Sequence, residues 1–154
     1  MKIPEYIWDE ETGTATCRIY YKGLCFEGFA HCHEIDSDMK SRLTGEKIAE
    51  FRAMRKYLRH IKAYEIKPRL AALNDYYNSI CKNTKFNANS YEMKILRRRI
   101  RFLEDDLDTI NESIAVVNKN LNEYISSKEK MFKKLRNKRL VKTDKKEASE
   151  IQKK

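Results

Sequence analysis

The chain has 154 residues and a formal net charge of +10, with 36% charged residues but only four glycines and two prolines. This length allows one domain with at most an extension, and the composition is typical of a helical, coiled-coil-rich protein. We expect a cytoplasmic protein with no membrane contact, because no apolar run could span a bilayer and no signal-peptide pattern opens the chain.

The basic excess is concentrated at the C-terminal end of the sequence. Residues 133–154 contain ten lysines or arginines against three acidic residues, so the rest of the chain is nearly balanced. This distribution weakens any argument from net charge to nucleic acid, because a basic tail is often disordered. We expect 141–154 to be a basic, flexible tail.

Residues 1–44 predict a small antiparallel sheet. An edge strand over 3–8 and a turn over 9–13 precede two strands, 15–21 and 24–33, which the dipeptide Lys22-Gly23 joins as a two-residue hairpin. That register pairs Cys17 with Gly28 and gives the hairpin one apolar face. We expect a helix to lie on this face and to cross closely at Gly28, which has no side chain.

Residues 45–81 predict the first long helix, with Thr44 as its N-cap. An apolar stripe runs from Ile48 to Ile61 and resumes at Ile66, but its phase slips by a residue between the two halves. Pro68 follows the slip, so we expect a kink there or two separate helices. The first half should pack on the hairpin and the second half on the next helix.

Residues 90–140 predict a very long helix that begins near Ser90, where Asn89 and Glu92 resemble a capping box. Thirteen positions at alternating spacings of three and four run from Met93 to Leu135, and only Lys128 among them is not apolar. This pattern is the signature of a coiled coil. We therefore expect a homodimer or higher oligomer, parallel or antiparallel, with its seam formed by Leu96, Ile100, Leu103, Leu107, Ile110, Ile114, Val117 and Leu121.

Two groups of basic residues are candidates for binding an anion or an acidic partner. Guanidinium groups suit phosphates and carboxylates because their planar fork can bind two oxygens. The alternatives are a solvated helix face, nucleic acid, a nucleotide-sized anion and an acidic protein surface. The first group lies on the first helix and the second near the start of the long helix: Arg52, Arg55, Lys56, Arg59 and Lys62, and Arg97, Arg98, Arg99 and Arg101.

Metal binding and catalysis are both disfavoured by the sequence. Cysteines and histidines gather at Cys17, Cys25, His31, Cys32 and His33, but strand alternation scatters them over both faces of the hairpin. A structural zinc site needs four ligands that converge on one point. Without a phosphate loop or a nucleophile motif, we expect no metal, no cofactor and no enzymatic activity.

The segments Tyr21–His33 and Gly45–Ala53, together with Lys85–Glu92 and Leu96–Arg99, resemble small uncharacterised proteins of phages that infect Gram-positive bacteria. The strand–turn–strand–helix order is also similar to half of a double-stranded-RNA-binding domain. The resemblance brings no catalytic residue. It implies a phage protein in the cytoplasm of a bacterial host, where small non-enzymatic proteins often counter host defences.

The predicted fold is α+β, with a small antiparallel sheet packed on a long helical hairpin whose second helix extends as a coiled coil. The preferred function is that of a non-catalytic binder, such as an anti-defence protein that blocks a host defence protein or captures an anionic ligand. The alternatives are a nucleic-acid-binding protein of phage or mobile-element origin and a structural coiled-coil assembly protein.

Overall fold

The computed structural model describes residues 3–31, 41–82 and 90–151, with side chains up to residue 138. Three strands come first, β1 (Glu5–Asp9), β2 (Thr14–Tyr21) and β3 (Leu24–His31). The helical part follows as α1 (Arg42–His60), the π-helical turn η2 (Ile61–Ile66), α2 (Lys67–Cys81) and α3 (Tyr91–Ile151). This is the predicted α+β arrangement.

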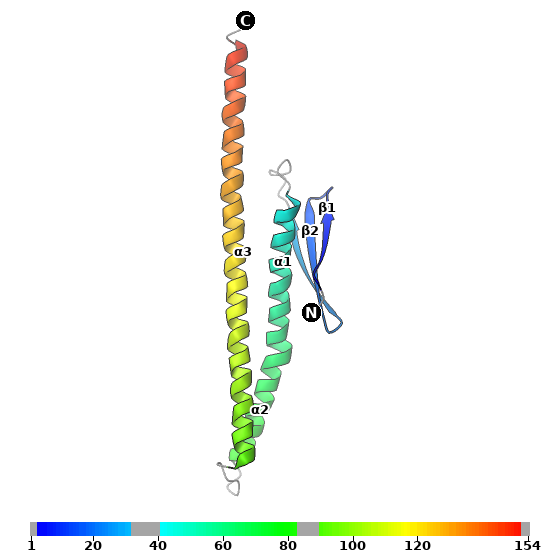
Figure 1. Cartoon of the computed structure of the whole chain (residues 1–154), viewed down its shortest axis with the longest axis vertical. Helices are drawn as coiled ribbons and strands as arrows, with labels where there is room; N and C mark the ends of the chain where they lie inside the picture. The colour runs from blue at the N-terminus through cyan, green and yellow to red at the C-terminus, as the bar shows by residue number, and fades with distance from the viewer. Residues whose placement is uncertain (1–2, 32–40, 83–89, 152–154) are drawn as a thin grey trace.

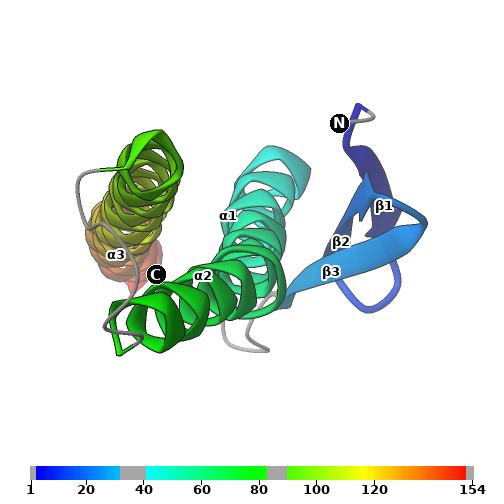
Figure 2. The same cartoon turned by 90° about the horizontal axis from the view of Figure 1, so that it is seen from below.

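The elements form three layers with α1 in the middle. The sheet covers one side of α1, and α3 runs along the other side (Figures 1 and 2). α2 continues the line of α1 and packs beside the beginning of α3. α3 has 61 residues, or ~90 Å at 1.5 Å per residue, and its C-terminal end extends beyond α1 (Figure 1).

The sheet has the order β1-β2-β3 and is antiparallel throughout. Cys17 pairs with Gly28 and Arg18 with Glu27, so the predicted hairpin register is confirmed. Lys22 and Gly23 both have positive φ, 49° and 80°, which suits a two-residue turn whose twist matches the flanking strands. β1 is an edge strand, also as predicted.

The core between sheet and helix is made of small side chains. Ala49 and Ala53 of α1 are fully buried against Ala15, Cys17 and Ile19 of the sheet. At Gly28 the helix approaches the strand so closely that a Cβ would collide with backbone atoms of Ala49 and Ala53. The predicted close crossing at this glycine is therefore confirmed.

The start of α1 differs from the prediction. Ser41, not Thr44, is the N-cap, and its hydroxyl oxygen accepts a hydrogen bond from the backbone N–H of Thr44 at 3.3 Å. Thr44 lies inside the first turn, where it is buried and its hydroxyl donates to Ser41 Oγ. Serine and threonine are both common N-cap residues. The sequence alone favoured Thr44, which lies three residues after the observed N-cap.

η2 explains the slip in the apolar stripe. A π-helical turn contains about one residue more than an α-helical turn. The extra residue brings Ile66 back onto the buried side of the helix, where Leu58 of α1 also lies. Its last hydrogen bond runs from the backbone N–H of Lys67 to the carbonyl oxygen of Lys62. Pro68 follows within the first turn of α2, where a missing N–H costs least. The predicted break is thus a wide turn placed before the proline.

α2 and α3 form the predicted antiparallel helical hairpin. Met93, Leu96 and Ile100 are buried against α2, where they contact Leu70, Leu73, Tyr77 and Ile80. Ser90 precedes α3 and its hydroxyl accepts from the N–H of Met93 at 3.3 Å, whereas Asn89 lies outside the described residues. Farther along, Leu121 is buried and the ring of Tyr124 contacts that of Phe51 in α1.

The end of α3 also differs from the prediction. The helix does not end near Leu140 but continues to Ile151, so most of the expected flexible tail, 141–154, is helical in backbone. The sequence from Tyr91 onward contains no glycine or proline that would end a helix. Within the described chain, none of the helices has the length and hydropathy to cross a membrane.

Candidate binding groove

The apolar seam of α3 is used within the chain. Leu96, Ile100 and Leu121 are buried in the single subunit. Five further seam residues between them are half-buried: Leu103, Leu107, Ile110, Ile114 and Val117. α1, η2 and α2 all contact α3, so much of the predicted oligomer seam already has an intramolecular partner. Its role as an interface between subunits stays a prediction.

The predicted basic residues of α1 do not form one open face. Arg52 donates a hydrogen bond from Nη1 to the backbone carbonyl oxygen of Phe29 at 2.5 Å. The ammonium nitrogen of Lys56 lies 5.7 Å from the centroid of the Phe29 ring. These two side chains therefore hold α1 to β3. Arg55 and Lys62 are half-buried, whereas Lys56 and Arg59 are exposed. The sequence pattern did not separate these roles. Spacings of three and four residues place side chains on one face of a helix but do not show what that face contacts.

The basic residues of α3 also divide. Arg97 donates from Nε to the hydroxyl of Tyr77 at 3.0 Å, which ties α3 to α2. Arg101 is exposed. Arg98 and Arg99 line a groove between the two helices, together with Arg69 of α2. Neither Arg98 nor Arg99 has a carboxylate partner within ion-pair distance among the described residues.

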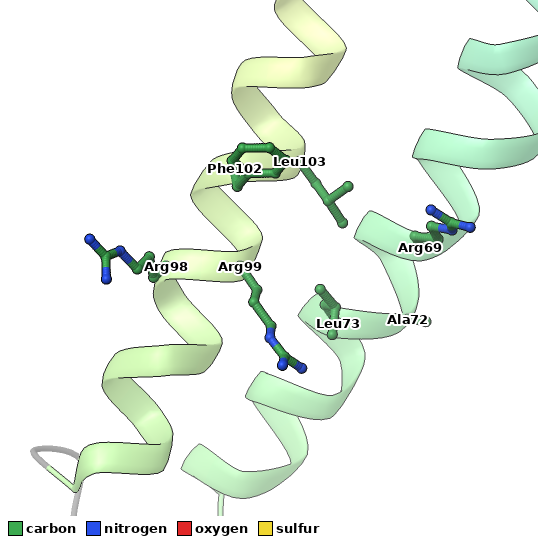
Figure 3. Close-up of a pocket in the computed structure, with 7 residues that line it drawn as sticks. All are labelled: Arg69, Ala72, Leu73, Arg98, Arg99, Phe102 and Leu103. Atoms are coloured by element: carbon green, nitrogen blue, oxygen red, sulfur yellow. The ribbon is translucent and has the colours of Figure 1, made fainter.

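The groove has an apolar floor and a volume of about 730 Å³. Leu73 and Leu103 lie between the two helices, and Phe102 sits on the α3 side with 65% of its surface exposed (Figure 3). Arg99 reaches from α3 towards α2, whereas Arg98 and Arg69 lie at the two outer margins (Figure 3). The arrangement is an apolar strip with guanidinium groups along it.

A smaller hollow of about 300 Å³ continues along the same helices, and Arg69, Leu103 and Asp106 are among the residues that line it. Glu65 lines it as well, and the ammonium of Lys22, 2.8 Å away, is the main cause that lowers the pKa of this carboxyl. Arg69 lowers it further, to a smaller extent. Arg69 therefore already faces a carboxylate, which leaves Arg98 and Arg99 as the cationic groups most available to a ligand.

Sequence reasoning found Arg98 and Arg99 but missed Arg69 as part of the same surface. Their proximity depends on the register of α2 against α3, which follows from the π-helical turn and from the length of the loop. Phe102 could be recognised as an aromatic residue off the main seam. Its exposure beside two arginines could not.

The cysteine and histidine cluster offers no reactive centre in the described residues. Cys17 is fully buried, and burial is the main cause that raises the pKa of its thiol to about 11, which disfavours the nucleophilic thiolate. Cys25 is exposed on β3, and His31 Nδ1 lies 2.9 Å from the hydroxyl of Thr14. Cys32 and His33 lie outside the described residues. Among the residues described, no group of three or more potential ligands could hold a metal ion.

Comparisons with protein-family models, with curated proteins and with solved structures find no match to this chain. Function is therefore inferred from the groove and from the surface of α3.

Proposed function

We propose that this protein is a non-catalytic binding protein, of the kind that blocks a host factor, and that it docks an acidic partner protein in the groove between α2 and α3. The observation that carries the proposal is Phe102, an aromatic side chain that is 65% exposed next to two arginines without acidic partners. Aromatic residues and arginine are enriched among the residues that dominate binding energy at protein interfaces.

The chemistry of the groove favours a particular kind of partner. Leu73, Leu103 and Phe102 would take apolar side chains, and burial of that surface would provide most of the affinity. Arg98 and Arg99 would meet carboxylates at the margin, where charge pairs contribute to orientation and association rate. An amphipathic helix with acidic residues beside its apolar face has both features.

Nucleic acid is the alternative ligand, and the groove fits it less well. A nucleic-acid backbone is best followed by a continuous row of cationic groups, with affinity that falls steeply as salt rises. Here Arg52 and Lys56 are engaged with β3 and Arg97 with Tyr77, so the predicted basic groups do not form such a row. The apolar floor would also remain without a partner on a phosphate backbone.

The proposal can be tested by capture with matched baits. The full-length chain, the double variant Arg99→Glu with Phe102→Ala, and the control Arg101→Glu would be immobilised and exposed to lysate of a Gram-positive bacterium. Arg101 is exposed on the same helix but does not line the groove, so it controls for net charge. Proteins retained by the wild type and the control but lost on the double variant would be purified and titrated directly.

We expect direct titration of such a purified partner to show binding at least about tenfold weaker for the double variant, or about 1.4 kcal/mol. Equal affinity of all three baits would contradict the proposal. Retention of RNA or DNA that is lost on the double variant, with no protein lost in parallel, would replace the proposal with the nucleic-acid alternative.

A further inference from the structure

We infer that the exposed side of α3 that continues from Phe102 towards the C-terminus binds another copy of this chain, and that the two α3 helices run antiparallel with their twofold axis near Asn120. This dimer face adjoins the groove, because Phe102 lies two helical turns before Thr109 on the same side of the helix. It is a row of exposed residues beside the buried seam, with Met131 of the predicted seam at its C-terminal end.

The centre of this face is a narrow strip of apolar and small polar side chains. Val116 is 55% exposed and Met131 is 40% exposed. They are about four helical turns apart and so lie on the same side of α3. Thr109, Asn120 and Ser127 lie on the same strip, because each is four or seven residues from a neighbour in the row. Small polar residues allow two helix backbones to approach closely, and a polar residue at one central position can fix the register.

The charges beside this strip change sign along the helix. Asp105 and Glu112 flank its N-terminal half, and Lys130 and Lys134 flank its C-terminal half on the same side of the helix. Glu112 and Lys130 are about five turns apart, which places them in one straight row. All four side chains are exposed, and none forms an ion pair with another described residue.

This pattern specifies the direction of pairing. In a parallel pair each flank of one helix faces the opposite flank of the other, so Glu112 and Lys130, which share one flank, would not meet across the pair. An antiparallel pair about Asn120 places Glu112 opposite Lys130 and Asp105 opposite Lys134, twice in the twofold dimer. It also lays the part of α3 that extends beyond α1 (Figure 1) along the N-terminal part of the second α3.

Disulfide trapping tests the direction. Glu112→Cys and Lys130→Cys would be made as separate chains of different mass, with all cysteines except the buried Cys17 changed to serine. We expect a mixed disulfide between the two variants under oxidation and little cross-linking of either variant alone. Disulfides within each variant alone, without the mixed product, would contradict the antiparallel arrangement.

Charge reversal tests whether this face forms the dimer. Light scattering would measure the particle mass of the wild type and of each variant. We expect the wild type to be a dimer. The dissociation constant of the dimer should be at least about tenfold higher for Asp105→Lys with Glu112→Lys. Adding Lys130→Glu and Lys134→Glu should restore the dimer. Glu104→Lys with Glu129→Lys makes the same change in charge at exposed positions about 100° or more around the helix from the strip, and it should leave the dimer unchanged. A wild-type chain that remains a monomer at all concentrations would overturn the inference.

Discussion

The two ends of the α1–η2–α2 layer are packed in different ways. At the sheet end, α1 comes so close to β3 at Gly28 that a Cβ there would collide with backbone atoms of Ala49 and Ala53. At the hairpin end, α2 meets α3 through long side chains, none of the residues of α2 is buried, and a groove stays open beside Leu73. The sheet end is therefore closely packed, whereas the hairpin end has an open surface that can accept a partner.

The largest effect should come from the closely packed end. Gly28→Ala places a Cβ against the backbone oxygen of Ala49 and the backbone nitrogen of Ala53, neither of which can turn aside as a side chain could. We expect a loss of about 3 kcal/mol or more in the free energy of unfolding, at the upper end for overpacked cores. Urea denaturation followed by circular dichroism would measure it.

Cys25→Ala is the control for Gly28→Ala, because Cys25 lies on the same strand and is exposed. Its free energy of unfolding should be close to that of the wild type. If Gly28→Ala were as stable as this control, the close approach of α1 to β3 would be wrong.

The hairpin end should be more tolerant of a core change. Leu96→Ala removes a side chain that is buried between α3 and α2, and we expect a loss of about 2 kcal/mol, the low end for buried leucines, because this end can relax. Hydrogen exchange should show faster exchange in α2 but unchanged exchange in the sheet. Leu43→Ala, at an exposed leucine of α1, is the matched control and should change neither. Equal acceleration in the sheet would mean that the two ends unfold as one unit.

The sheet end should also lose stability in alkali through Cys17. Its thiol has a pKa of about 11 in the folded chain, above its usual value of 9.0, so the unfolded chain releases the proton first. The stability that this group contributes is complete below pH 9 and falls as the pH rises from 9 to 11, by on the order of 2 kcal/mol. Denaturation at pH 8 and pH 11 would measure the fall.

The variant Cys17→Ala separates this thiol from other alkaline effects. Tyr6, whose pKa is raised to about 12 mainly by burial and to a smaller extent by the charge of Cys17, titrates in both proteins, so most of its contribution cancels in the comparison. We expect a smaller alkaline loss in the variant than in the wild type. Identical losses in the two proteins would show that the Cys17 thiol does not contribute.

The smallest effect on stability should come from the groove itself. Phe102→Ala removes a side chain that is 65% exposed, so the free energy of unfolding should change by no more than about 0.5 kcal/mol. Thermal unfolding would check this value beside the binding assay. A loss as large as that of Leu96→Ala would mean that Phe102 holds the hairpin together and is not kept for a partner.

The sequence predicted the sheet end almost completely. Strand alternation, the Lys22-Gly23 turn and the bare position at Gly28 are local signals, and each specifies a face or a register without knowledge of the rest. The apolar stripe likewise predicted that the first half of the helical layer would meet the sheet and the second half α3, but not that α1 would also pack on α3. Thr44 shows the limit of such signals, because two neighbouring residues could cap the same helix.

The groove could be predicted only in part, because its residues come from two helices. Arg98 and Arg99 were found by composition, but their proximity to Arg69 depends on how the π-helical turn sets α2 against α3. The seam from Leu96 to Leu121 had the opposite problem. Its periodicity indicates a helical partner but cannot say whether that partner is the same chain or another one.

Hydrogen–deuterium exchange with the captured partner tests the central claim most directly. The chain would be compared alone and in complex with the purified protein that it retains. We expect slower exchange in the complex to be confined to the groove, over Arg69–Leu73 of α2 and Arg98–Leu103 of α3. Protection of the sheet or of α1, with the groove unchanged, would contradict the proposal that the open end of the helical hairpin is the binding site.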